Sequence, residues 1–254
     1  MRRLVIESDY HAGHWAGLTP PDWYQSGKKG KHQKELWEFR QSVLKDIGHI
    51  DFLVVNGDCI DGKGTRSGGS ELSTSDRAEQ CEMAAASIDS AGASECGIIY
   101  GTPYHTGQDE DWEQVVANKC VTPIAFVSGQ EFLEYDGVTF DIKHKVGGST
   151  IPHGRHTAVA KEKLWNLIWA EREGQPKADV IVRSHVHYFA YCGGPDWVAM
   201  TTPAWQGHGS KFGVRQCSGT IDLGLIVFEI EDGEYSWRPI LADLKQQVAR
   251  VTKR

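Results

Sequence analysis

The sequence predicts an α/β protein with two packed mixed β-sheets flanked by helices, an αββα sandwich. In the first half of the chain, short apolar runs that end at turn residues alternate with longer segments of helical periodicity. In the second half strands predominate, and one helical segment precedes four strand-like runs. This order is typical of two sheets packed face to face with helices outside. No composition shift divides the chain, so we expect residues 1–254 to form a single domain.

Three short apolar runs predict the strands of the first half, at 3–8, 51–57 and 96–101. Apolar residues at helical spacing predict a helix over 32–48. A second helix is expected to begin at Ser73, three residues before Asp76, and to run to about Ser90. Acidic residues in a first turn, where they complement the helix dipole, predict a third helix over 109–119.

The second half begins with alternating residues that predict a strand over 138–144 with one exposed side. A helix is predicted over 157–174, with its large apolar side chains facing the core: Leu164, Leu167 and Ile168, together with Trp165 and Trp169. The remaining strands are predicted at 178–185, 196–203, 220–233 and 234–241.

Composition excludes several classes of protein. The longest apolar runs are too short to cross a bilayer, so no membrane partner is expected. A net charge of −7 argues against a broad electrostatic contact with nucleic acid but leaves a local one open. The six cysteines form no C-x-x-C pair and no regular spacing, which favours reduced thiols and a cytoplasmic location.

Side chains able to bind metals follow one predicted strand after another. They are Asp9, His11, Asp58, Asp61, His105, His144, His185 and His187. In open α/β sheets, sites form beyond the carboxyl ends of strands, so these loops can converge. Carboxylates and neutral imidazoles with few thiolates suit two divalent ions about 3.5–4 Å apart, which clamp a phosphate and activate water. Asp-x-His and His-x-His would place two donors on one side of an extended segment.

These residues resemble the five ordered motifs of the calcineurin-like metallophosphoesterase family. The corresponding stretches are "DYH" (9–11), "GDCID" (57–61), "GTPYH" (101–105), His144 and "SHVH" (184–187), and the resemblance spans residues 3 to about 230. The stretch "HAGHWAGLTPPDW" (11–23) further resembles phosphoesterases carried by phages and prophages. The family fold agrees with the predicted sandwich.

The resemblance implies a role for each motif residue. The implied ligands of a first metal are Asp9, His11, Asp58 and His187. Asp58 would bridge to a second metal, completed by His144 and His185, and Asp61 would orient a ligand. We expect Mn²⁺ first among the candidate metals, although Fe, Zn, Co or Ni would also suit an Asp/His site.

The third motif departs from the family pattern. The family has Asn after the glycine, whereas this chain has Thr102, and His105 lies three residues beyond it. His105 would either keep the family's catalytic role at the phosphate or take the place of the missing Asn on the second metal. A threonine hydroxyl is a poor metal ligand, so we do not expect Thr102 to substitute. His208 and Arg66 lie in Gly-rich stretches from which they could contact substrate.

The expected function is therefore hydrolysis of phosphoric esters by a metal-bound hydroxide at a dinuclear centre. A phosphodiester of a nucleotide or of nucleic acid, such as DNA, is favoured, which would make the protein a phosphodiesterase or nuclease. The alternatives are a phosphomonoesterase or protein phosphatase, and a non-catalytic scaffold with the same fold. A basic cluster at 27–34 could add a nucleic-acid contact if an aromatic residue such as Trp15 lay near it.

Overall fold

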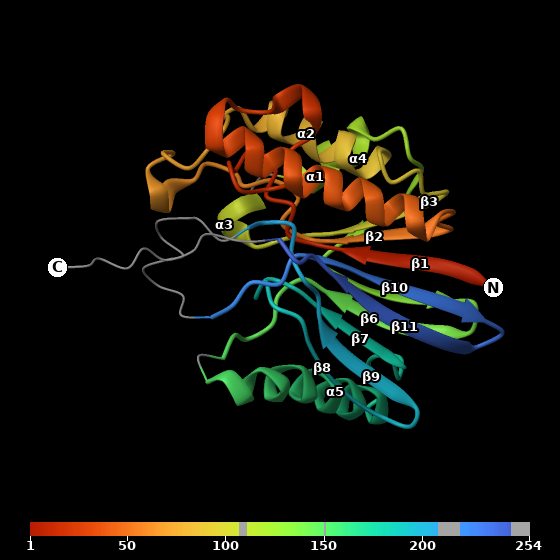
Figure 1. Ribbon diagram of the computed structural model, residues 1–254. Coiled ribbons are helices and arrows are strands. Elements are labelled where there is room, and N and C mark those ends of the chain that lie inside the picture. The colour runs from red at the N-terminus through yellow and green to blue at the C-terminus, as the bar shows by residue number, and fades with distance from the viewer. Residues whose placement is uncertain (107–110, 150, 208–218, 245–254) are drawn as a thin grey trace.

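Two mixed β-sheets pack against each other, and helices cover their outer faces (Figure 1). The computed structural model describes residues 1–106, 111–149, 151–207 and 219–244, except the side chain of Arg66. The predicted fold class is confirmed. No helix in these described ranges is both long and apolar enough to span a membrane.

The first sheet has the strand order β11-β10-β1-β2-β3-β4. Its strands are β1 (Arg2–Glu7), β2 (Phe52–Asn56), β3 (Glu95–Ile99), β4 (Ile124–Ser128), β10 (Gly224–Glu231) and β11 (Glu234–Leu241). Strands β1 to β4 are parallel, whereas β10 and β11 are antiparallel additions next to β1. The central strand β2 reads as a continuous apolar run because both of its faces are buried.

The second sheet has the order β5-β6-β7-β9-β8. Its strands are β5 (Gln130–Tyr135), β6 (Val138–Lys143), β7 (Val180–Arg183), β8 (Ala190–Gly194) and β9 (Trp197–Thr201). The central strands β6, β7 and β9 are parallel, and the edge strands β5 and β8 are antiparallel to their neighbours. The sequence-based prediction omitted strands β5 and β8 of the second sheet and strand β4 of the first sheet.

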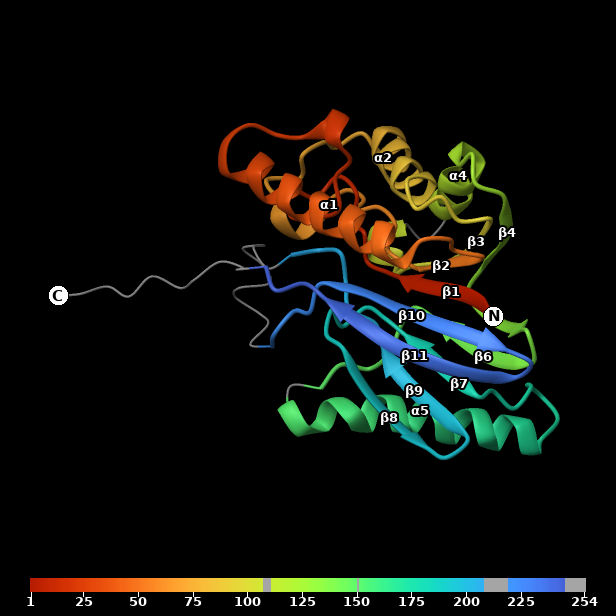
Figure 2. The same ribbon diagram turned by 45° about the vertical axis from the view of Figure 1, so that its right-hand side comes forward.

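Helices lie on both sides of the sandwich (Figure 2). On the side of the first sheet are α1 (Gly27–Ile47), α2 (Arg77–Asp89) and α4 (Trp112–Lys119). On the side of the second sheet is α5 (Arg155–Glu171). Short helices complete the described chain: α3 (Pro103–Thr106), η1 (Pro21–Trp23), η2 (Thr65–Ser67) and η3 (Pro152–Gly154).

Alternation along β1 separates two apolar layers. Leu4 and Ile6 face the second sheet, where they share a cluster with Phe140 and Phe228, whose ring centroids lie 5.1 Å apart. Val5 points the other way, into the layer beneath α1, α2 and α4. Alternate side chains of the strands therefore build the apolar layer between the two sheets.

Two local predictions for the helices were wrong. Helix α2 begins at Arg77, and its N-cap is Asp76, whose carboxylate accepts from the Ala78 N–H at 2.8 Å. Ser73 instead donates its hydroxyl to the Gly13 carbonyl. Helix α1 begins at Gly27, so the basic cluster at 27–34 is part of the helix and does not precede it.

The prediction for α5 was also wrong, because this helix turns its large apolar side chains outward. Leu164 and Trp165 are each 57% exposed. The buried side chains of the helix are Val159, Lys163 and Asn166.

Candidate metal centre

The predicted donors follow strands of both sheets, and backbone hydrogen bonds join their loops. The N–H groups of Asp9 and His11 donate to the carbonyls of Gly57 and Asp58, each at 3.0 Å. On the second sheet, the Ser184 N–H donates to the His144 carbonyl at 2.7 Å. The structure thus brings together side chains that are far apart in the sequence, as the strand-end argument predicts.

Five of the predicted donors have a left-handed backbone. Their φ angles are 53° at Asp9, 45° at His11, 50° at Asp58, 73° at His185 and 55° at His187. Non-glycine residues adopt such angles at a cost of about 1–3 kcal/mol each, and they do so mainly at functional sites. The expectation that Asp-x-His and His-x-His lie on extended strands was wrong, because β1 and β7 end before them. Each pair converges because the chain curls after its strand.

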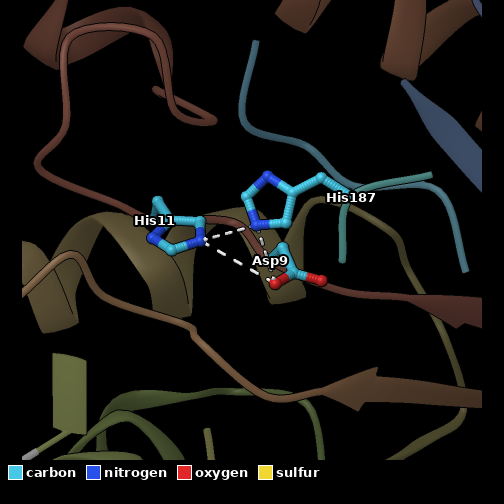
Figure 3. A group of neighbouring side chains, drawn as sticks. All are labelled: Asp9, His11 and His187. Carbon is cyan, nitrogen blue, oxygen red and sulfur yellow. Dashed lines mark hydrogen bonds and ion pairs between the residues drawn. The ribbon is translucent and has the colours of Figure 1, made fainter. Parts of the chain in front are cut away.

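One group of donors consists of Asp9, His11 and His187, which we call the Asp9 group (Figure 3). The Asp9 Oδ1 atom lies 3.1 Å from His187 Nε2 and 3.8 Å from His11 Nε2. The two imidazole Nε2 atoms are 3.3 Å apart. All three side chains therefore direct a donor atom toward the same point.

A second group consists of Asp58, His144 and His185, which we call the Asp58 group. The Asp58 Oδ2 atom lies 3.1 Å from His144 Nε2 and 3.9 Å from His11 Nε2 in the Asp9 group. In the same way, Asp9 Oδ1 lies 3.9 Å from His144 Nε2. The two groups are adjacent, and a carboxylate from each faces an imidazole of the other.

Asp61 lies behind His11. Its Oδ1 atom is 3.1 Å from His11 Nδ1, which leaves Nε2 directed toward Asp9 and Asp58. This is the arrangement by which a carboxylate fixes the ring of a metal-binding histidine. His144 is fixed in a similar way, because its Nδ1 donates to the Asn56 carbonyl at 2.7 Å.

His105 lies on the Asp61 side of the centre. Its Nδ1 donates to the Asp61 carbonyl at 2.8 Å, and its ring meets that of His11 edge to face with centroids 4.5 Å apart. It forms a possible ligand group with His11 and Asp61, whereas the Asp58 group contains other residues. Its side chain is 16% exposed, compared with 2% for His11, so it lies nearer to solvent than the imidazole beside it.

The departure in the third motif has a structural counterpart at Asp58. The Thr102 N–H donates to Asp58 Oδ1 at 2.7 Å, and the Thr102 hydroxyl lies 3.2 Å from the same atom. A Cβ on Gly101 would approach that oxygen to 2.1 Å. This loop therefore positions the Asp58 carboxylate, a role that sequence reasoning missed even though Gly101 stands in the motif.

The serine in "SHVH" is accommodated by a buried polar network. Asn56 donates its amide to Ser184 Oγ at 2.7 Å, and Ser184 Oγ lies 2.6 Å from Thr202 Oγ1. Thr202 in turn lies 2.7 Å from Ser8 Oγ. The network links the ends of β1, β2 and β7 beneath the donors, so the serine side chain has its hydrogen-bond partners.

The carboxylates create a strong preference for positive charge. Burial alone would lower the pKa of His11, but hydrogen bonds to Asp61 and Asp9 and the nearby Asp58 charge raise it to about 10. Burial likewise opposes protonation of His144, but the Asp58 and Asp9 carboxylates raise its pKa to about 9. Burial would raise the pKa of Asp9, yet the His187 and His144 charges hold it well below the ordinary range. The metal-free centre thus holds protons where a cation would compete with them.

The donor set fits divalent cations. Among the described buried side chains, Asp9 Oδ1 and His144 Nε2 face the centre without a well-aligned hydrogen bond, although each lies 3.1 Å from a possible ion-pair partner. Buried carboxylates need a positive partner, and these two atoms are of the types that Mn, Fe, Zn, Co and Ni accept. The six residues of the Asp9 and Asp58 groups could therefore hold such ions.

Three other polar residues lie apart from the two donor groups or outside the part of the chain that the structure describes. His208 falls outside the described residues, and nothing is described of the Arg66 side chain. His14, in the loop after β1, is buried, and burial lowers its pKa to about 4. Its Nδ1 accepts from the Ala16 N–H at 3.0 Å, which indicates a structural role in the loop after β1.

No family model and no curated protein matches the sequence. Among solved structures, Vps29 from Entamoeba histolytica in complex with Zn²⁺ is 13% identical, with a TM-score of 0.47 over 94% of this chain and 98% of that chain. Vps29 from Chaetomium thermophilum is 8% identical, with a TM-score of 0.46 over 95% and 98%. An archaeal phosphodiesterase is 13% identical, with a TM-score of 0.44 over 94% and 99%. Likenesses at these values do not assign the chain to a family.

Proposed function

We propose that the protein is a metal-dependent hydrolase of phosphoric esters with a dinuclear centre, of the calcineurin-like metallophosphoesterase type. The observation that carries the proposal is the placing of Asp9 and Asp58, two buried carboxylates between two sets of imidazoles. An isolated structural ion pair would not need six donors from four loops. Two adjacent cation sites that share carboxylates would explain this arrangement, because paired metal ions can bind a phosphate ester and activate water.

Divalent cations bound here would supply Lewis acidity toward phosphoryl oxygens and lower the pKa of water. The chain itself would bind and orient them. Asp61 fixes the His11 ring, the Asn56 carbonyl fixes the His144 ring, and Thr102 holds the Asp58 carboxylate. Because each of these three donors is buried and hydrogen-bonded on its far side, the centre is preorganised and little reordering accompanies binding.

We further propose that His105 acts on the substrate phosphate. It is more exposed than His11, and the possible ligand group that contains it consists of His11 and Asp61 and not of the Asp58 group. Its Nδ1–H is committed to the Asp61 carbonyl, so a proton delivered to a leaving oxygen would have to sit on Nε2. The alternative, in which His105 replaces the family Asn on the second metal, has less support from this placement.

A phosphodiester of a nucleotide or nucleic acid is the favoured substrate. Support comes from the start of α1, where the Lys29 ammonium lies 5.8 Å from the ring centroid of Trp15. His32 packs edge to face on the same indole with centroids 5.8 Å apart. Trp15 lies in the same loop as His11. A cation beside an aromatic ring suits a nucleotide, because the cation can bind the phosphate and the ring can stack on the base. Phage origin, a cytoplasmic location, Mn²⁺ as the native metal and a single domain over 1–254 stay predictions.

The test combines metal analysis with two chromogenic substrates. Purified protein should contain divalent metal, or bind it, and should hydrolyse an aryl phosphodiester faster than the matching monoester when Mn²⁺ is added. Asp58→Asn should lose metal and activity while keeping its circular dichroism spectrum. Faster hydrolysis of the monoester than of the diester would favour a phosphomonoesterase or protein phosphatase. If the protein neither bound metal nor hydrolysed either substrate, the non-catalytic scaffold would be the remaining alternative.

A further inference from the structure

Helix α5 is inverted relative to an ordinary amphipathic helix. Its inward side uses polar groups: Lys163 donates to the Ala178 carbonyl, and Asn166 bonds to both Pro176 and Ala178 in the turn before β7. Val159 is its buried apolar contact with the second sheet. The inner side is thus occupied by caps for backbone groups, which leaves the large apolar residues on the outside.

The outward side carries a continuous apolar surface, which we call the α5 face. It is formed by Leu164, Trp165, Leu167 and Trp169, whose exposed fractions are 57%, 57%, 40% and 46%. Because these four large side chains are each about half exposed, together they present roughly 400 Å² of apolar surface to solvent. That equals the largest patch of a typical monomer, and such patches are often interaction sites. Figures 1 and 2 show α5 at the margin of the molecule, beside the β8–β9 hairpin.

We propose that the α5 face binds the α5 face of a second copy of this chain, as an antiparallel helix pair about a two-fold axis. Lys161, Leu164, Ile168 and Glu171 follow one another at spacings of three, four and three residues, so they lie along one stripe of the helix. Ile168 is partly exposed and lies next to Leu164 of the α5 face along this stripe. This is the seam along which two helices pack at a shallow angle.

The charges on this stripe are self-complementary. A two-fold axis midway between Leu164 and Ile168 places each of these residues opposite the other in the second copy. The same axis places Lys161 opposite Glu171, because each lies three residues beyond its apolar neighbour. Both charged residues are exposed, and the described part of the chain gives neither an ion pair. A parallel pair would instead set Lys161 against Lys161.

The area predicts a weak dimer. Roughly 400 Å² of apolar surface per copy is about half of the 800 Å² that each partner buries in a standard stable interface. A helix of 17 residues is about 26 Å long, so the charged ends extend the contact without doubling it. We therefore expect a dissociation constant in the micromolar range and a monomer in dilute solution. The inference does not rest on the proposed function, since α5 contributes no donor to the described metal centre.

Sedimentation equilibrium of the full chain across the micromolar range tests the proposal. The wild type should shift from monomer to dimer, and Leu164→Glu should remain a monomer with an unchanged circular dichroism spectrum. A monomer at every concentration, including one that binds lipid vesicles instead, would overturn the proposal. So would a dimer that Leu164→Glu leaves intact.

Charge exchange tests the antiparallel register. Lys161→Glu and Glu171→Lys should each weaken the dimer by about fivefold or more, because every dimer then contains two like-charge contacts. The double variant should restore wild-type affinity. Lys34→Glu on α1, at a site whose side chain is 61% exposed, makes the same change in net charge as Lys161→Glu and should have no effect. Failure of the double variant to recover would refute this register.

Discussion

Replacing Gly101 with alanine is expected to displace the Asp58 carboxylate and weaken metal binding. The added Cβ would lie 2.1 Å from Asp58 Oδ1 and 2.4 Å from the Asp58 nitrogen. To reach ordinary van der Waals separation, the carboxylate or its backbone must move by about 1 Å. Such overpacking costs about 1–3 kcal/mol of folding free energy. It also breaks the hydrogen bond from the Thr102 N–H, which is charge-assisted.

The consequence for metal binding follows from the role of the loop. Loss of a group that orients a ligand typically lowers metal affinity about 10–100-fold. Isothermal titration of Mn²⁺ into chelator-stripped Gly101→Ala measures this loss, and thermal unfolding measures the stability change. Gly129→Ala is the matched control, because no atom lies within 4 Å of the position that its Cβ would occupy. Wild-type affinity in Gly101→Ala would show that the third loop does not position Asp58.

Three further predictions concern neighbouring side chains. His105→Ala should lower the rate of diester hydrolysis about 10²–10⁴-fold with both metals retained; loss of one metal equivalent would make His105 a ligand. Asp61→Ala should lower metal affinity in titration calorimetry about 10–100-fold because the His11 ring loses its partner, and Asp61→Asn should recover part of it. Burial raises the pKa of Glu113 from its ordinary 4.5 to about 7, so the folded state binds this proton more tightly than the unfolded state. Glu113 should therefore contribute up to roughly 3 kcal/mol of stability to the metal-free protein, and this contribution is lost as pH rises from about 4.5 through 7. Urea unfolding at about pH 5 and about pH 8 should show a smaller fall for Glu113→Gln than for the wild type, because the raised pKa values of His11 and His144 lower the stability of both proteins over this interval. An equal fall in the two proteins would assign the whole effect to other groups.

The sequence predicted most of the sheet and the members of the donor groups because both depend on local signals. Buried parallel strands such as β2 are uninterrupted apolar runs, and the donors directly follow them. The edge strand β5 was missed because all of its side chains are partly or fully exposed and half of its residues are polar. The edge strand β8 ends in two glycines, which usually indicate a turn.

The orientation of α5 could not be read from periodicity. The pattern treats lysine and asparagine as outward residues, but Lys163 and Asn166 are needed inside to satisfy backbone groups of the following turn. The left-handed donors were equally hidden, because positive φ is normally announced by glycine and here falls on aspartate and histidine. In both cases a tertiary requirement overrode the local preference.

The division of the donors between two sheets gives the apolar layer a mechanical role. Asp9 and Asp58 follow strands of one sheet, whereas His144 and His187 follow strands of the other. Between the sheets lie close-packed side chains, among them Phe140 and Phe228. Such packing has low compressibility and transmits strain, so one sheet does not shift freely against the other. The apolar interior therefore keeps the donors from the two sheets aligned with one another. A substitution that loosened this packing would weaken the metal centre without changing any of its donors.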